Sequence, residues 1–140
     1  MVRMIMTMLV ALVAATACQA ATITITVHGV KTTEGDMRAS LCDSEARYKK
    51  DDCTHDGVVP AIKGTTTIKF EHVLPGRYAF TILHDKNKNG KMDSNFLNIP
   101  KEGFAFSNNI KPTFSEPPFK KVAFTVGDAD VAQSVDLVFY

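Results

Sequence analysis

Apolar and polar residues alternate along most of the chain with a period of two. Residues 22–27 read TITITV, so Ile23, Ile25 and Val27 would point to one side of a strand and the threonines to the other. This alternation is typical of a strand with one face buried. Five further segments show the same pattern, and we predict them as strands: residues 36–43, 65–70, 77–84, 121–126 and 134–140.

No segment after residue 20 shows helical spacing over the length that a helix needs. Short strands joined by turns predict an all-β fold, here an antiparallel β-sandwich of about seven strands. The residues expected to face inward from the five further strands are Met37, Ala39 and Leu41; Thr66, Ile68 and Phe70; Tyr78, Phe80 and Ile82; Val122, Phe124 and Val126; and Val135, Leu137 and Phe139.

The start of the chain follows a different pattern. Arg3 precedes an almost wholly apolar run, and Cys18-Gln19-Ala20 supplies small residues at the two positions that a signal peptidase reads. The run is too short to span a bilayer. We therefore predict a signal peptide over residues 1–20 and a single domain over residues 21–140, exported to the periplasm or secreted.

A lipid anchor is the alternative for this segment. Ala15-Thr16-Ala17-Cys18 resembles a lipoprotein cleavage site, in which Cys18 would carry the lipid and the protein would be an outer-membrane lipoprotein. Ala15 stands where leucine is usual, which favours ordinary cleavage.

Charge and cysteine content narrow the classes of partner and fold. The chain has 16 basic and 15 acidic residues, and Arg3 lies in the predicted signal peptide, so the domain carries 15 of each. Without a basic tract, nucleic-acid binding is not predicted.

Cys42 and Cys53 flank a charged excursion without apolar periodicity, residues 43–52. A lone pair in an oxidising compartment usually bonds, and redox pairs are normally spaced C-x-x-C, so we predict a structural disulfide.

Residues 84–93, HDKNKNGKMD, form the most distinctive stretch. Oxygen-bearing side chains occupy alternate positions and a glycine follows, which is the opening half of a calcium loop. An EF-hand would have glutamate at the twelfth residue, where this chain has Phe96. A solvated Asn/Gly turn is the alternative. The candidate ligands are the side chains of Asp85, Asn87, Asn89 and Asp93 and the carbonyl of Lys91.

Calcium, the only cofactor indicated, is expected to bind weakly. Two of these ligands are charged and the bidentate glutamate is missing, so we expect a dissociation constant of about 10⁻⁴ to 10⁻³ M. Zinc is not indicated, because His28, His55, His72 and His84 lack the spacing of a zinc motif.

The next segment, residues 94–120, is long for a connection in a compact domain. Its many apolar residues predict an ordered flap packed on the sandwich beside the calcium-type loop, with core packing as the more common role for its phenylalanines. Glu102 is the candidate for a further calcium ligand. The ligand-binding candidates are His84, Asn95, Ser107, Asn108 and Asn109, of which the last three would equally satisfy the flap's own backbone. The apolar residues are Phe96, Leu97, Ile99, Phe104, Phe106, Phe114 and Phe119.

Longer motifs resemble known families. Residues 70–80, FEHVLPGRYAF, resemble the L-P-G-x-Y turn of prealbumin-like and collagen-adhesin B-type sandwiches, whose Leu and Tyr plug one end of the core. That turn, HDKNKNGKMD and residues 95–109, NFLNIPKEGFAFSNN, are together similar to the exported bacterial family of unknown function DUF2141. This resemblance implies a small secreted β-sandwich with no established activity.

Two classes of function follow. The first is a non-catalytic exported module with a structural calcium site, which presents the flap, residues 95–119, to an envelope protein, a peptide or a glycan. The second is a small metal-dependent or hydrolytic enzyme that uses His84, Asp85, Asp93 and Glu102 as a cleft; the sequence offers His84 no nucleophile partner. An exposed concave site containing His84 would favour the enzyme.

Overall fold

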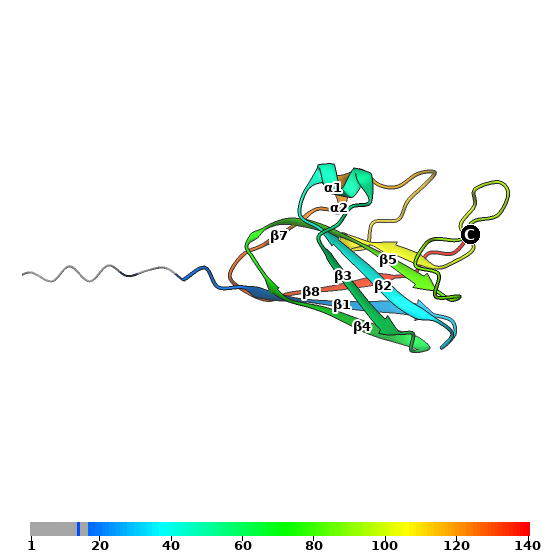
Figure 1. Cartoon of the computed structure of the whole chain (residues 1–140), viewed down its shortest axis with the longest axis horizontal. Helices are drawn as coiled ribbons and strands as arrows, with labels where there is room; N and C mark the ends of the chain where they lie inside the picture. Colours follow the sequence, from blue (N-terminus) through cyan, green and yellow to red (C-terminus); the bar gives the residue numbers. More distant parts are fainter. Residues whose placement is uncertain (1–13, 15–16) are drawn as a thin grey trace, which may run out of the picture.

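The computed structural model describes residue 14 and residues 17–140. The predicted signal peptide, residues 1–20, therefore lies mostly outside the described residues, and residues 17–20 have no regular secondary structure. All described strands and helices fall between Ala21 and Asp136, and they form a sandwich of two sheets (Figure 1). In the described part of the chain, no helix is both long enough and apolar enough to cross a membrane.

Eight strands build the two sheets, which confirms the predicted all-β sandwich. One sheet has three strands, with β1 between β4 and β8; the other has five, ordered β3-β2-β5-β6, with β7 paired to the start of β5. Neighbours are antiparallel except β1 and β8, which run parallel. The strands are β1 (Ala21–Val30), β2 (Asp36–Cys42), β3 (His55–Pro60), β4 (Gly64–Val73), β5 (Gly76–Asp85), β6 (Phe104–Phe106), β7 (Phe124–Val126) and β8 (Val131–Asp136).

The predicted alternation produces the core between the sheets. Ile23, Ile25 and Val27 of β1 are fully buried, and they belong to one cluster with Met37 of β2 and Phe80 of β5 from the facing sheet. Burial of each such side chain contributes about 1.5–3 kcal/mol, so this cluster is the main source of stability. It fixes which face of each strand points outward.

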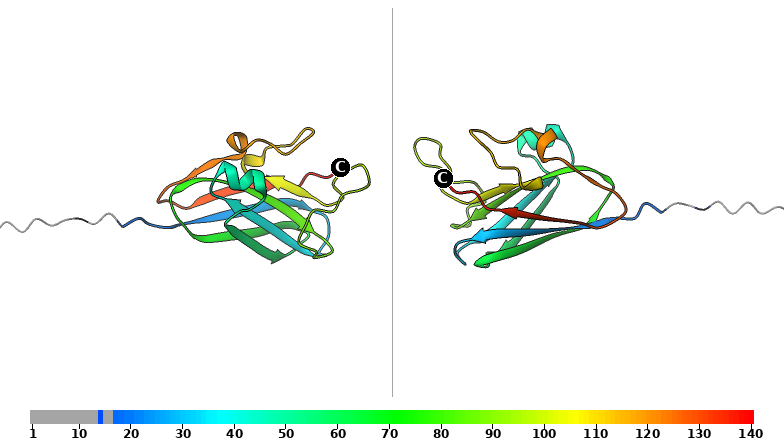
Figure 2. Two further views of the ribbon diagram at one scale, coloured as in Figure 1. Left: turned by 45° about the horizontal axis from the view of Figure 1, so that its top comes forward. Right: turned by 180° about the vertical axis from the view of Figure 1, so that it is seen from behind.

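A second apolar cluster lies on the outer face of the five-stranded sheet. Two short helices, α1 (Glu45–Lys50) and α2 (Phe119–Val122), cover that face (Figure 2). The rings of Tyr48 in α1 and Phe119 in α2 pack edge to face, with centroids 5.8 Å apart. Phe104 and Phe106 of β6 belong to the same cluster, so these three phenylalanines of the flap are core residues, as expected.

Several predicted boundaries were wrong. The strand predicted over residues 121–126 is α2 followed by β7, the strand predicted over residues 134–140 is β8 and ends at Asp136, and β3 and β6 were not predicted. β6 has only three residues, which is too short to show alternation. In β3, HDGVVP, burial alternates but polarity does not follow it, because Gly57 lies on the inner face and Val58 on the outer face.

The predicted disulfide between Cys42 and Cys53 is confirmed. It joins the end of β2 to the segment before β3 and closes the excursion that carries α1. That excursion is helical, which its sequence did not indicate. Ser44 caps the helix by accepting a hydrogen bond on its Oγ from the N–H of Arg47 at 3.3 Å. Six residues are too few for a stable isolated helix, so the cap and the tether account for it.

The turn between β4 and β5 corrects one implication of the sandwich resemblance. Tyr78 is buried and its hydroxyl donates a hydrogen bond to the carbonyl of Leu74 at 2.8 Å, so it does close this end of the core. Leu74 does not, because its side chain is 59% exposed. Val73, one residue earlier, is fully buried in the core.

Candidate functional site

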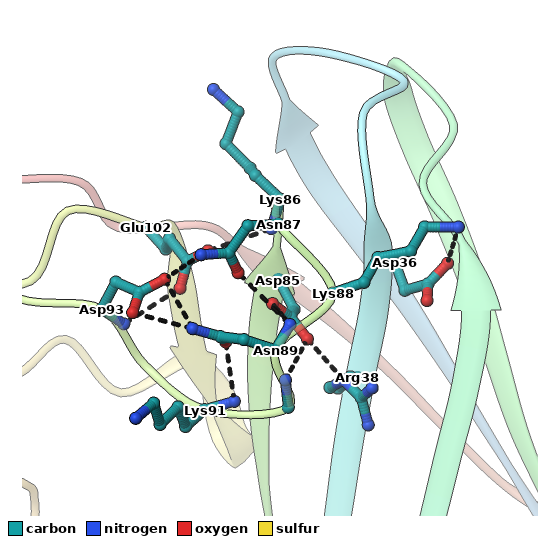
Figure 3. Close-up of polar contacts among 11 residues, drawn as sticks. Asp36, Arg38, Asp85, Lys86, Asn87, Lys88, Asn89, Lys91, Asp93 and Glu102 are labelled. Carbon is teal, nitrogen blue, oxygen red and sulfur yellow. Dashed lines mark hydrogen bonds and ion pairs between the residues drawn. The ribbon is translucent and has the colours of Figure 1, made fainter.

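The calcium-type loop, residues 85–93, begins at the end of β5 (Figure 3). Asp85 is fully buried. Its Oδ1 accepts a hydrogen bond from the N–H of Asn89 at 3.1 Å, and its Oδ2 accepts from the N–H of Gly90 at 2.8 Å and from Nε of Arg38 at 2.7 Å. Burial alone would raise the pKa of this carboxyl, but these donors outweigh it and lower the pKa below its usual value. Asp85 is therefore an ionised anchor of the loop.

The other polar side chains of the loop converge on Asp93. The amide nitrogen of Asn87 donates to Oδ2 of Asp93 at 2.6 Å, and that of Asn89 lies 2.9 and 3.0 Å from the two carboxylate oxygens. The amide oxygens of both asparagines accept N–H groups two residues further along the chain. The structure thus brings together three of the predicted calcium ligands by direct contact, as Figure 3 shows.

Glu102, predicted as a further ligand, lies beside the loop and bonds to its backbone. Its Oε1 accepts from the N–H of Lys86 at 3.0 Å, and its Oε2 accepts from the N–H of Asp93 at 3.1 Å. The side chain is buried, with 5% exposed. The carboxylate therefore ties the two ends of the loop together, and each oxygen keeps a free lone pair.

Arg38 is the residue of this site that sequence reasoning missed. It faces outward from β2, and the register that sets Asp36 opposite Asp85 brings its guanidinium beside that carboxylate. The alternation along β2 predicts that Arg38 faces outward. It does not predict that β2 pairs with β5, which brings together Arg38 and Asp85, 47 residues apart. Because Arg38 neutralises Asp85, Asp93 is the one remaining charged candidate ligand within the loop, and Glu102 is the charged candidate beside it.

The donors present fit a hard cation held weakly. Calcium prefers carboxylate, amide and carbonyl oxygens, which this loop offers. An ion would compete with the hydrogen bonds from Asn87 and Asn89 to Asp93, because both amides would turn their oxygens inward. Among the described residues, no group of three or more His, Cys, Asp or Glu side chains is placed to hold a metal. A cation here would therefore depend on amide and carbonyl oxygens.

A groove of about 510 Å³ runs along the outer face of the five-stranded sheet beside the loop. Its walls include α1, Met92 of the loop and Glu116 of the flap. The floor has both polar and apolar side chains, and Ser40 of β2 donates to Asp56 of the neighbouring β3 at 2.7 Å. The outward-facing residues of the floor are Arg38, Ser40, Asp56, Val58, Thr81, Leu83, Phe104 and Phe106.

His84 lies on the opposite side of β5 from this groove. Its ring is 1% exposed, and its Nε2 is 2.8 Å from the carbonyl oxygen of Glu34. The structure therefore does not bring His84 and the carboxylates into one exposed cleft, which is the arrangement that the enzyme hypothesis needs.

Asn108 and Asn109 bond to other parts of the protein. The amide nitrogen of Asn108 donates to the carbonyls of Lys121 and Ala123 at 3.2 and 3.0 Å. Asn109 accepts the N–H of Asp136 on its amide oxygen at 3.0 Å. These two candidates thus attach the flap to α2 and β8.

Ser107 is fully buried, and its Oγ accepts from the N–H of Phe80 at 3.1 Å and donates to the carbonyl of Val122 at 2.5 Å. Ser107→Ala should lower the free energy of unfolding by about 2 kcal/mol, because both buried backbone groups lose their partner. Urea denaturation measures this. Ser115→Ala, at an exposed serine of the flap, is the control and should change stability by less than about 0.5 kcal/mol. Equal effects would contradict this role.

The flap does not bury all of its apolar side chains, which corrects the expectation from the sequence. Phe96 is 92% exposed, Leu97 is 63% exposed and Phe114 is 102% exposed. Ile99 is also exposed. Only Phe104, Phe106 and Phe119 of the seven are buried. Some apolar side chains of the flap are therefore buried, and the others are exposed to solvent.

Asn95 fixes the part that carries Phe96, the loop of residues 94–100. Its Oδ1 accepts from the N–H groups of Leu97 and Ile99 at 2.8 and 3.1 Å, and its own N–H donates to the carbonyl of Ile99 at 2.9 Å. An isolated antiparallel bridge closes the base of the loop. The loop is thus held by its own hydrogen bonds with two apolar side chains outward.

The chain matches a known protein family. A family model described as an uncharacterized protein conserved in bacteria (DUF2141) matches residues 25–134, which include the whole calcium-type loop and the flap. No curated protein and no solved structure matched the chain. The matched region covers most of the 140 residues and confirms the resemblance drawn from the turn and loop motifs. The chain belongs to the DUF2141 family of bacterial proteins.

Proposed function

We propose that this protein is an exported, non-catalytic module that presents its flap, residues 95–119, to a partner, with a weakly bound calcium ion bracing the neighbouring loop. One observation supports this most: the flap holds Phe96, Leu97 and Phe114 in water although hydrogen bonds and buried residues fix its path. Large apolar groups that ordered neighbouring loops keep exposed mark interaction surfaces.

Two further observations support export. The Cys42–Cys53 disulfide is the kind of bond that persists in oxidising compartments and is rare in the cytosol. The basic residue, apolar run and small residues at the start of the chain have the pattern of a secretory signal. The periplasm and the extracellular medium both meet these conditions.

Calcium would brace the loop from which the flap starts. Asn87, Asn89 and Asp93 would supply oxygens to the ion, which would contribute the positive charge that draws them together. Asp85 and Glu102 hold the ends of the loop through backbone N–H groups whether or not an ion is bound. This division makes calcium a clamp on a preformed loop, with a dissociation constant of about 10⁻⁴ to 10⁻³ M.

Calcium is expected to raise the melting temperature, because an ion at 100 times its dissociation constant stabilises the folded state by about 2.7 kcal/mol. Asp93→Asn should abolish this response, because within the loop it removes the one ligand charge that Arg38 does not neutralise. Scanning calorimetry in about 10 to 100 mM calcium, which is 100 times the expected dissociation constant, and in chelator measures both.

Asp128→Asn is the matched control. Asp128 is exposed in the turn between β7 and β8, so this substitution removes one negative charge away from the calcium-type loop. It should keep the full calcium response. Identical melting temperatures of the unaltered protein in calcium and in chelator would leave the loop as an ordinary turn and end the calcium proposal.

A further inference from the structure

Two loops of the flap project from the same end of the molecule, beside the C-terminal residues and opposite the end at which β1 begins (Figures 1 and 2). The first comprises residues 94–100 and the second residues 111–118. Residues of both line one apolar depression of about 370 Å³, so the loops are neighbours. Phe96 and Leu97 belong to the first loop and Phe114 to the second. These three are the most exposed apolar side chains at this end of the molecule.

Neither loop depends on its apolar side chains for its shape. The hydrogen bonds of Asn95 hold the first loop, as described above. The second contains three prolines, and the carbonyl of Pro117 accepts a hydrogen bond from the hydroxyl of Tyr48 at 2.9 Å. Since the loops are already ordered, a partner that contacts Phe96 and Phe114 meets little further entropy cost.

Of the charged residues that flank the first loop, the two most exposed to solvent are both lysines. Lys91 and Lys101 flank it, are exposed, and form no ion pair with any described residue. The nearby carboxylates of Asp93 and Glu102 accept hydrogen bonds from the calcium-type loop itself. The outer surface at this end therefore combines projecting aromatic groups with free lysines.

The second loop carries one carboxylate, Glu116. It is exposed and lines both the groove and the depression between the two loops. This single carboxylate is outnumbered by Lys91 and Lys101, so the exposed charge around the two loops stays positive.

We infer that the partner of the flap is a lipid bilayer with anionic headgroups, into whose interface Phe96, Leu97 and Phe114 insert while Lys91 and Lys101 contact the headgroups. This rests on the proposed function in using the flap as the contact surface. A protein partner would need a separate complementary pocket for each projecting loop, whereas fluid lipid accommodates single side chains at any spacing. Apolar insertion and cationic contact together drive interfacial binding.

The test uses residues 21–140, which contain every described strand and helix, and co-sedimentation with vesicles of phosphatidylcholine alone or mixed with phosphatidylglycerol. Binding is expected to the anionic vesicles and to be at least tenfold weaker on the neutral ones. Phe96→Ala and Phe114→Ala should each lower the partition coefficient about tenfold. Lys91→Gln and Lys101→Gln should each lower it about fivefold.

Leu97→Ala and Leu74→Ala form a matched pair, because the two leucines are 63% and 59% exposed but lie at opposite ends of the sandwich. Leu97→Ala should weaken vesicle binding several-fold and Leu74→Ala should leave it unchanged. Equal binding of these two variants would overturn the inference. Absence of binding to both kinds of vesicle would also overturn it, and would point to a protein as the partner.

Calorimetry on the same samples separates this inference from the calcium proposal. Vesicle binding without any effect of calcium on the melting temperature would remove only the calcium clamp. A calcium-dependent melting temperature without vesicle binding would remove only the lipid partner. All of the substituted side chains are exposed, so the variants should melt within a few degrees of the unaltered protein.

Discussion

Asp85→Ala is expected to lower the free energy of unfolding by about 3 kcal/mol even in chelator. The substitution removes a buried carboxylate that three donors share, and breaking a buried ion pair costs about 3–5 kcal/mol. The lower end applies because the Arg38 side chain is 33% exposed and can turn toward water. The N–H groups of Asn89 and Gly90 would also lose their acceptor. Urea denaturation in chelator measures this change.

Asp93→Ala separates the two roles that carboxylates have in the same loop. Asp93 is only partly buried, and its partners are exposed amides, so its loss should cost about 1 kcal/mol or less in chelator. It should nevertheless abolish any response to calcium. If Asp93→Ala destabilises the chelated protein as much as Asp85→Ala, the distinction between anchor and ion ligand is wrong.

Removal of the disulfide is the other large effect. Replacing Cys42 and Cys53 with alanine should lower the free energy of unfolding by about 3 kcal/mol, because the open chain gains conformational freedom in the unfolded state. The loss of stability should be largest at α1, because a helix of six residues is not stable without the tether. Denaturant unfolding of the double variant measures it.

The reduced form of the unaltered protein is the matched comparison for that variant. Its free energy of unfolding should agree with that of the double alanine variant within about 1 kcal/mol. Titration of unfolded, unreduced residues 21–140 should find no reactive thiol, because both cysteines of this region are bonded. A variant as stable as the oxidised protein would show that the bond does not support the fold.

The strands that the sequence predicted well share one property. In β1, β2 and β5 the inward side chains are large and apolar, so burial and alternation coincide. β3 lacks this agreement, because Gly57 lies on its inner face and Val58 on its outer face. The partners of each strand could not be predicted, because register depends on long-range contacts. The parallel pairing of β1 with β8 is an example.

The site was predicted in its local part only. The spacing of Asn87, Asn89 and Asp93 is a property of one loop, and the structure does bring these side chains together. Arg38 reaches the same loop from another strand, which no local pattern reports. For the flap, counting apolar residues gave the wrong exposure for Phe96, because the hydrogen bonds of Asn95 decide where that side chain points.

The parallel contact between β1 and β8 has a consequence for the order of folding. Ile23 pairs with Val131, so the central strand of the three-stranded sheet gains its second neighbour only after most of the chain has been gathered. Contacts so distant in sequence make folding slow, on the order of milliseconds to seconds. Until then the segment TITITV has an unpaired edge of high β-propensity, which can join the same edge of another chain. Pairing of β8 with β1 thus covers an edge that would otherwise stay open to another chain.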